Sequence, residues 1–365
     1  MAMNLVERSV RYIEERKQRL EEGKINCIPS PLYQFKYDFP GTEQATYYLI
    51  SGGAKASKSK FTNFIFLFNT VLWLYDHPDL IRLKVFYALL EETQLNIMLK
   101  FMCYVLFVKY RIRTDIKELK SIEQSRRVKP EVLEIIKSLE MQSILHFFEE
   151  HIEWIPDRNP TGIFNNVEKY AKSHGTIHKK WSEPLQKEVF DWYQPNDPDE
   201  YVLIIIDHIG IISDERGFDR RESIKKLSEY LKILRNKYGY SPVVVQQQNS
   251  ETLSLDAYKQ NKVFPTQKGL LDCQDTSRDC DIFLGIVNPY SFEFKTFGEG
   301  YDITKLRSYA RWLKVVQGRD GESDATLGMY FDGATGWYAA LPHHTNTVEL
   351  NKVYQLVQRN RTIST

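Results

Sequence analysis

The chain has 365 residues, of which 49 are Lys or Arg and 48 are Asp or Glu, so its formal net charge is +1. This balance excludes a protein coated with positive charge for nucleic acid, although it leaves room for a local basic channel. Hydrophobic residues make up 42% of the chain, which is enough for a sizeable core and excludes a disordered protein. The length fits two domains or one large α/β domain with extensions.

Three features of the sequence indicate the cytoplasm and argue against a membrane. Residues 1–24 are densely charged, unlike a signal peptide. The most apolar stretch, residues 61–75, is short and contains polar residues, so we expect no membrane contact. The four cysteines lack metal-type spacing, and a chain of this size does not need a disulfide scaffold. We therefore expect a soluble protein of the reducing cytoplasm.

The first predicted element is a helix over residues 4–22, where apolar residues recur at helical spacing between charged ones. Its single apolar stripe suits either packing on its own domain or docking on a neighbouring subunit. Gly23 ends this helix. A segment of turns follows, then a short apolar strand over 46–50, a loop containing two glycines, and a helix over 60–75.

The remaining elements alternate between strands and helices. Residues 115–153 read as a polar helical region, and 156–198 as loops with short elements. The other predicted strands and helices are strands at 83–90, 201–206, 242–246, 281–287, 311–317 and 326–331, and helices at 94–110 and 220–238. This alternation predicts an α/β fold with a mostly parallel sheet.

The loop after the first long strand resembles a P-loop, in which backbone N–H groups, a Lys and a hydroxyl hold phosphates and Mg²⁺. The pattern G-x-x-x-x-G-K-[ST] is met at every fixed position except one, because Ser57 stands where the second glycine belongs. Its Cβ makes a left-handed conformation costlier. The alternative is a lysine-containing turn that binds nothing. The predicted nucleotide-binding residues are Gly52, Gly53, Ala54, Lys55, Ala56, Ser57, Lys58 and Ser59.

Polar residues end three other predicted strands. Asp207 follows the apolar run 201–206, where an acid can hold Mg²⁺ directly or through water. Glu91 ends another strand and can orient an attacking water. The glutamines 246–248 end a third, and one of them can touch the γ-phosphate. Together with the P-loop, these residues predict a ligand site on one rim of a parallel sheet.

The order of these motifs resembles the RecA-like ATPase domain of DnaB-type replicative helicases, particularly phage forms, over about residues 4–342. The segments that carry the resemblance are Ile28-Pro29-Ser30-Pro31, Phe39-Pro40-Gly41, Ala56-Ser57-Lys58-Ser59, Phe86-Tyr87-Ala88-Leu89-Leu90-Glu91-Glu92, Ile204-Ile205-Ile206-Asp207, Val244-Val245-Gln246-Gln247-Gln248-Asn249, Asp279-Cys280-Asp281 and Gln317-Gly318-Arg319-Asp320-Gly321. The resemblance implies ATP as substrate and Mg²⁺ as metal, in the cytoplasm of a host cell if a phage encodes the chain.

The family pattern also implies roles for single residues. Lys58 and Ser59 would bind the phosphates and Mg²⁺, with Asp207 as the second acidic residue beside the metal. Glu91 would be the catalytic carboxylate. Gln247 would be the glutamine sensor of the γ-phosphate.

Arg319 would be the arginine finger, which acts on the nucleotide of the adjacent subunit and makes hydrolysis depend on ring assembly. The alternative for Arg319 is an ordinary hairpin-turn residue, because Asp320 and Gly321 follow it. Family members usually carry a basic residue two positions before the finger, where this chain has Gln317; Lys314 is nearby in a different register. This departure and Ser57 put the rate of hydrolysis in doubt.

The resemblance also predicts assembly. The helix over 4–22 matches the linker helix that packs on the neighbouring ATPase domain and closes a homo-hexameric ring. The expected division is a linker helix at 1–24, the ATPase domain at 25–345 and a C-terminal tail at 346–365. The N-terminal primase-interaction domain of cellular members has no counterpart here, which puts coupling to a primase or loader in doubt, although either remains an expected class of partner.

A ring helicase holds single-stranded DNA through loops that line its pore, using positive charge and main-chain donors. Segments 214–226 and 249–272 fit by position, and the second follows Gln247 directly. The alternative is a solvated charged loop, since acidic residues dilute the first segment. The predicted DNA-binding residues are Arg216, Arg220, Arg221, Lys259, Lys262 and Lys268.

These observations favour an ATP-driven ring helicase or translocase on single-stranded DNA. A second hypothesis is a catalytically weak RecA-like protein that binds nucleotide or DNA as a structural or accessory ring, and Ser57 and Gln317 are its evidence. A third is a recombinase or circadian-clock-type ATPase on the same core. Fold analogy alone does not separate them.

Overall fold

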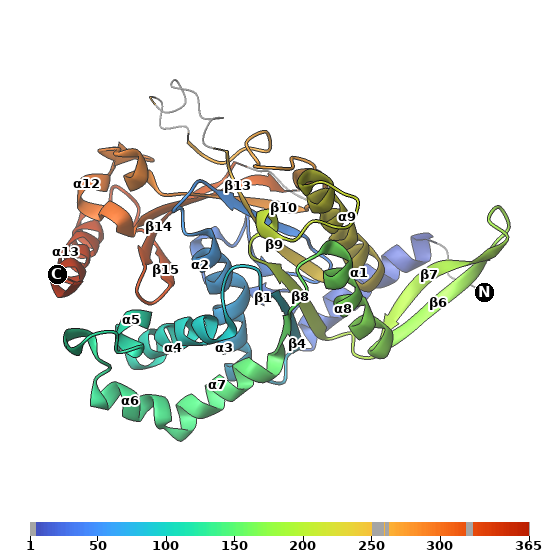
Figure 1. Cartoon of the computed structure of the whole chain (residues 1–365), viewed down its shortest axis with the longest axis horizontal. Coiled ribbons are helices and arrows are strands. Elements are labelled where there is room, and N and C mark those ends of the chain that lie inside the picture. The colour runs from blue at the N-terminus through green and yellow to red at the C-terminus, as the bar shows by residue number, and fades with distance from the viewer. Residues whose placement is uncertain (1–4, 250–258, 260–262, 319–323, 365) are drawn as a thin grey trace.

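The computed structural model describes residues 5–249, 259, 263–318 and 324–364. Its centre is a nine-stranded sheet in the order β15-β14-β13-β10-β3-β9-β8-β4-β5 (Figure 1). These strands are β3 (Tyr48–Gly52), β4 (Arg82–Ala88), β5 (Ile152–Ile155), β8 (Glu200–Ile206), β9 (Ser241–Gln247), β10 (Ile282–Val287), β13 (Ala310–Gly318), β14 (Thr326–Asp332) and β15 (Trp337–Ala340). From β10 to β5 all neighbours are parallel, whereas β13, β14 and β15 add antiparallel pairs. The predicted mostly parallel α/β sheet is confirmed.

Helices cover both faces of the parallel part. Side chains alternate along each buried strand, so that Leu203 and Ile205 face one core while Ile204 and Ile206 face the other. The first core is closed by α2 (Lys58–Thr62), η2 (Asn63–Phe68), α3 (Asn69–Asp76), α4 (Gln94–Tyr110), α6 (Pro130–Lys137) and α7 (Leu139–His151); the second by α8 (Pro160–Ser173) and α9 (Arg220–Tyr238). The shorter elements are β1 (Ile28–Pro29), η1 (Tyr33–Phe35), β2 (Gly41–Thr42), α5 (Ile116–Leu119), η3 (Gln124–Arg126), η4 (Ile209–Ile211), α11 (Thr276–Asp279), η6 (Pro289–Phe292), β11 (Thr296–Phe297), β12 (Tyr301–Asp302), α12 (Ile303–Leu306) and η7 (Arg307–Tyr309).

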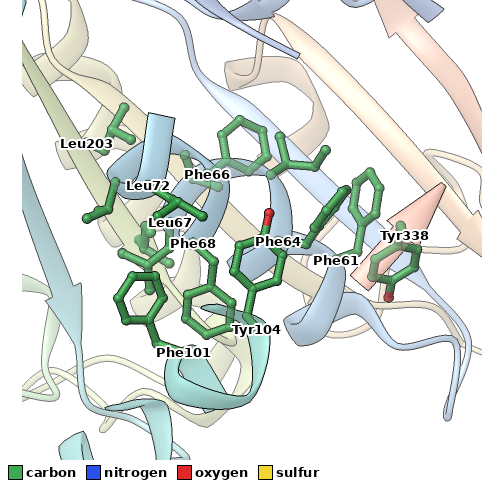
Figure 2. Packing of buried hydrophobic residues seen from close by; sticks show 14 of the residues in the cluster. Phe61, Phe64, Phe66, Leu67, Phe68, Leu72, Phe101, Tyr104, Leu203 and Tyr338 are labelled. Atoms are coloured by element: carbon green, nitrogen blue, oxygen red, sulfur yellow. The ribbon is translucent and has the colours of Figure 1, made fainter. Parts of the chain in front are cut away.

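Aromatic side chains fix the helix that follows the P-loop. Figure 2 shows Phe61, Phe64 and Phe68 along this helix, between Tyr338 on one side and Phe101 on the other. The Phe64 and Tyr338 rings lie 5.2 Å apart, and the Phe68 and Phe101 rings 5.4 Å apart. Each buried aromatic side chain removes a large apolar surface from water, so the start of this helix has little freedom to move. The helix predicted at 60–75 begins at Lys58 and includes the π-helical segment η2.

The prediction for residues 156–198 was wrong. This region forms α8 and a long antiparallel hairpin of β6 (Gly175–Ser182) and β7 (Lys187–Pro195), in which Ile177 is paired with Tyr193. Much of the hairpin projects from the body on the side where the N-terminus lies (Figure 1), so it needs no continuous apolar run. Its turn has no glycine, and Gln186 takes the positive φ of 49° that a glycine would adopt more easily. Both sequence signals of a hairpin, an apolar run along the strands and a glycine in the turn, were therefore absent from residues 175–195.

The region 115–153 contains α5, α6 and α7, as its helical pattern predicted, and then adds an edge strand. That strand is β5, whose Ile152 is paired with Val85 of β4. The predicted strand at 83–90 ends at Ala88, two residues earlier than expected.

The two ends of the chain are helices. α1 (Leu5–Glu21) is tied to the body near its end by an ion pair between Arg19 and Asp199. The expected C-terminal tail is largely the helix α13 (Thr347–Ser364), which packs through Leu350 and Val357. Asn360 Nδ2 also donates to the Tyr330 hydroxyl at 2.9 Å. No helix in the part of the chain that the structure describes has the length and apolar character that a membrane crossing needs.

Candidate nucleotide-binding site

The P-loop connects β3, in the middle of the sheet, to α2. Gly52 is required by space, because a Cβ there would lie 2.4 Å from the carbonyl oxygen of Ile286 on the neighbouring strand. Lys55 and Ser57 take left-handed conformations, with φ of 60° and 73°. Each such residue other than glycine costs about 1–3 kcal/mol. Ser57 therefore adopts the conformation for which the motif normally uses glycine.

Lys58 begins α2 and is nearly buried. Its Nζ donates a hydrogen bond of 3.0 Å to the carbonyl of Gly53, on the other side of the loop. Burial lowers the pKa of Lys58, and the Asp207 and Glu91 carboxylates oppose this change. The ammonium group therefore spans the loop and lies near two acids.

Ser59 and Asp207 meet across the site. Ser59 Oγ donates a hydrogen bond of 2.9 Å to Asp207 Oδ1, and Asp207 follows the last residue of β8 directly. Burial raises the pKa of Asp207 to about 6; the Ser59 hydrogen bond opposes this, and the nearby Glu91 and Glu92 add to it. A hydroxyl and a carboxylate in contact are the oxygen donors that Mg²⁺ takes in nucleotide sites, so this pair fits the metal.

Two acids follow β4, and the structure separates them. Glu92 forms an ion pair with Lys100 of α4. Glu91 is exposed and lines the same hollow as Lys58. Within the described part of the chain, no hydrogen bond or ion pair engages the Glu91 side chain. Glu91 is therefore the one of the two whose carboxylate is available to a water molecule.

The three glutamines at the end of β9 have three different environments. Gln246 is buried, and its Nε2 donates to the carbonyls of Leu271 and Cys273 at 2.6 and 2.8 Å. Gln248 Nε2 donates to Ser51 Oγ at 3.0 Å. Only the middle residue, Gln247, lines the hollow above the P-loop. The alternation of side chains along a strand explains why one of three was available.

One hollow of about 480 Å³ at the carboxyl edge of the parallel strands is lined by Lys58, Ser59, Glu91 and Gln247. Asp207 contacts Ser59 at this hollow. The structure adds residues that sequence reasoning missed. His208 lies 3.5 Å from Gln247, between ring Nε2 and amide Nε2, and burial lowers its pKa. Its position directly after Asp207 was the available signal. Three other added residues that line the hollow, Lys60, Glu92 and Val245, are chain neighbours of predicted site residues. The remaining three, Lys100, Arg311 and Phe331, come from other segments, and no local sequence signal marked them.

A second hollow of about 450 Å³ lies beside the first and shares Lys60, Lys100, Arg311 and Phe331 with it. Arg113 lines its other side and forms an ion pair of 2.7 Å with the buried Asp332. The two hollows together extend the site beyond the phosphate-binding loop.

Arg319 lies outside the described residues, as does Lys262. The strand that leads to Arg319 is described: Gly318, the last residue of β13, is paired with Ile282, the first residue of β10. The P-loop instead follows the last residue of β3, which runs parallel to β10. The end of β13 therefore lies at the sheet edge opposite the P-loop.

The predicted DNA-binding residues follow β8 and β9, which are neighbours in the sheet. Arg216, Arg221, Lys259 and Lys268 are exposed. Arg220 is engaged within its own loop, because it forms an ion pair of 3.0 Å with Asp214 and donates to backbone carbonyls. Its guanidinium therefore supports the loop, and a role in binding DNA has less support than for the other four.

The chain has a RecA-like α/β fold, with a P-loop-like turn at the carboxyl edge of its parallel strands. Among solved structures, the ATPase domain of G40P aligns with a TM-score of 0.64 and 13% identity, over 94% of this chain and 100% of that one. A DnaB-like replicative helicase, described with its interactions with primase, aligns with a TM-score of 0.62 and 12% identity, over 93% of this chain and 67% of that one. The chain matches no family model and no curated protein. The similarity therefore establishes the fold, which is that of DnaB-like helicase ATPase domains.

Proposed function

We propose that this protein is an ATP-hydrolysing ring translocase that acts as a helicase on single-stranded DNA. One observation carries the proposal: Lys58, Ser59 with Asp207, Glu91 and Gln247 come together at one edge of a RecA-like sheet. These residues lie at or just beyond the carboxyl ends of four neighbouring strands, β3, β9, β8 and β4. An accidental match to the P-loop pattern would not bring the other three strand ends with it.

In this proposal the P-loop binds the phosphates of ATP. Lys58 leaves its contact with Gly53 and neutralises phosphate charge. Ser59 and Asp207 would hold Mg²⁺, which when bound would stabilise negative charge on the phosphoryl oxygens. The adjoining hollow beside Arg113 accepts the base and sugar, because it shares four lining residues with the phosphate hollow and is lined partly by Tyr309 and Phe331.

Glu91 orients the attacking water and accepts its proton as the bond to the γ-phosphate breaks. Gln247 touches the γ-phosphate. When the γ-phosphate is lost, Gln247 shifts, and the segment that follows β9 shifts with it. That segment contains Lys259 and Lys268, which we propose as DNA-binding residues together with Arg216 and Arg221. Loss of the γ-phosphate would thus move the loop that holds DNA.

Assembly into a homo-hexameric ring is supported by α1. Arg19 ties one end of this helix to the body, whereas Val6, Val10 and Ile13 are 71%, 49% and 65% exposed. Apolar residues repeated at helical spacing on an exposed helix suit docking against a second copy. We propose residues 1–24 as this linker, 25–345 as the ATPase domain and 346–365 as a C-terminal extension. A primase or a loader is a further proposed partner.

The test is ATP hydrolysis by the full chain with and without single-stranded DNA, compared with Glu91→Gln. Turnover that DNA stimulates and that Glu91→Gln removes is the expected result. Nucleotide binding without turnover would instead favour the accessory or structural ring, for which Ser57 in the P-loop is the evidence. Absence of nucleotide binding would reject the translocase and leave only an accessory ring that binds DNA.

A further inference from the structure

Ser57 is held by a residue that is distant in sequence. Arg311, the second residue of β13, reaches the P-loop and donates to Ser57 Oγ from Nη2 at 2.7 Å and from Nε at 3.1 Å. Nε also lies 3.1 Å from the carbonyl of Ala56. On the other side, the Tyr338 hydroxyl donates to the Ser57 carbonyl at 3.2 Å. The side chain and the carbonyl of this one loop residue are thus both bound.

Arg311 is itself firmly placed. It is 4% exposed, its Nη1 donates to the carbonyls of Ser308 and Ala310 at 2.9 and 2.7 Å, and its guanidinium lies 4.6 Å from the centre of the Phe331 ring. A group fixed by its own strand on one side can fix the P-loop on the other. Planar geometry with several donors suits arginine for this task and not lysine.

The Arg311 guanidinium forms no ion pair with a carboxylate of the described residues. Burial lowers the pKa of Arg311 to about 10, so it is still charged at neutral pH. Arg311 lines both the phosphate hollow and the adjoining one. A buried cation without a paired anion is costly, and a phosphate chain bound at the P-loop would bring negative charge to the hollow that Arg311 lines.

We propose that Ser57 and Arg311 form a coupled pair that takes the place of the second P-loop glycine. Arg311 holds Ser57 in the left-handed conformation that a glycine would adopt freely, and the phosphates of the bound nucleotide balance its charge. Arg311 is thus a positioning residue, and the departure of Ser57 from the motif does not by itself mean a defective loop. This inference rests on the proposed function, because it concerns the same nucleotide site.

The pair can be tested by a double-mutant cycle. A glycine at position 57 needs no support, so the loss of Arg311 should matter less in its presence. We would measure the affinity for Mg·ATP of the wild type, R311M, S57G and S57G/R311M. R311M should weaken binding by about tenfold or more, since the left-handed conformation costs roughly that factor. The same change should weaken binding by only about threefold in the S57G background, where the charge term alone is lost.

Two further variants separate geometry from charge and from stability. R311K keeps the charge without the planar donors, so its affinity should lie between those of the wild type and R311M. Arg307, on the same segment, lines a separate hollow beside α13. R307M should leave ATP affinity unchanged, and thermal unfolding of each variant shows whether it is folded. Equal losses from R311M in both backgrounds, or no loss in either, would overturn the coupled pair.

Failure of the proposed function can be told apart from failure of this inference. If the wild type binds no nucleotide, hydrogen exchange of the loop amides at residues 53–58 tests the pair without a ligand. R311M should then speed exchange with Ser57 in place, and much less in the S57G background. Equal exchange in R311M and wild type would reject the pair in either case.

Discussion

The two ends of β13 lie in different environments. Near its first residue, Arg311 is buried and tied to the P-loop of its own subunit. At its last residue, Gly318 reaches the opposite edge of the sheet, roughly 24 Å further along the strand. Because β13 runs antiparallel to β10, one strand serves the nucleotide site at one end and leads away from it at the other.

On the proposed function, this difference would let one strand serve two nucleotide sites. Arg311 contacts the P-loop of its own chain, whereas Gly318 lies at the opposite edge of the sheet. If the protein forms the proposed ring, we expect Arg319 to act on the nucleotide of a neighbouring copy, and the exposed apolar stripe of α1 to dock on that copy.

The largest expected effect is at the P-loop itself. Lys58→Ala should bring nucleotide binding below detection, because it removes the one ammonium that spans the loop. Isothermal titration with Mg·ATP measures this. Unchanged affinity, with a normal unfolding curve, would mean that this loop does not bind nucleotide. The Arg311 end of β13 would then not serve a nucleotide site.

Arg319→Ala should leave ATP binding intact and lower DNA-stimulated turnover by about 10³-fold, as expected for an arginine supplied by a neighbour. Steady-state hydrolysis and a binding titration on the same preparation separate the two effects. If turnover persists, the residue that completes the site lies elsewhere.

Glu91→Gln should lower the turnover rate by about 10²-fold or more without weakening ATP binding, because the water loses its base. Glu92→Gln is the matched control, since the Glu92 carboxylate is already paired with Lys100. A larger loss in the control than in Glu91→Gln would exchange the roles of the two acids.

Ile13→Asp should weaken assembly, because a charge replaces an exposed side chain of the apolar stripe. We expect a several-fold shift toward smaller species by light scattering at equal concentration. Arg8→Asp, off the stripe on the same helix, is the control. Equal assembly of both variants would indicate that α1 only packs on its own domain.

The smallest expected effect concerns DNA. Arg216→Ala with Arg221→Ala should weaken single-stranded DNA binding a few-fold and lower the salt slope by about 0.7 for each DNA phosphate that the variant no longer neutralises. Arg359→Ala, exposed on α13, is the control. A salt slope equal to that of the wild type would mean that these arginines do not face the DNA.

Local patterns predicted the parts of the molecule that are built locally. The apolar runs of β8 and β9 predicted buried parallel strands, and the P-loop pattern predicted the strand, loop and helix that the structure shows as β3, residues 53–57 and α2. The three consecutive glutamines showed that a strand ends there, but only packing decides that Gln247 faces the hollow. Local sequence patterns were therefore enough to predict the rim of the site and its order.

What the sequence did not predict depends on distant contacts. Nothing near position 57 indicates that Arg311, 254 residues away in the chain, would bind its side chain. The β6–β7 hairpin was missed because it is largely exposed and its turn uses Gln186 where a glycine would have marked it. In both places a residue adopts a left-handed conformation that its type does not favour, and only the folded surroundings show why.

Mixing two inactive variants tests most directly whether the two ends of β13 serve neighbouring nucleotide sites. Lys58→Ala subunits keep Arg319 but lack a working P-loop, whereas Arg319→Ala subunits keep the P-loop but lack the finger. We predict that mixed assemblies regain part of the wild-type, DNA-stimulated ATP turnover, because some sites then combine an intact P-loop with an intact Arg319. If the mixture stays as inactive as its components while the wild type turns over, the two ends of β13 do not serve neighbouring nucleotide sites.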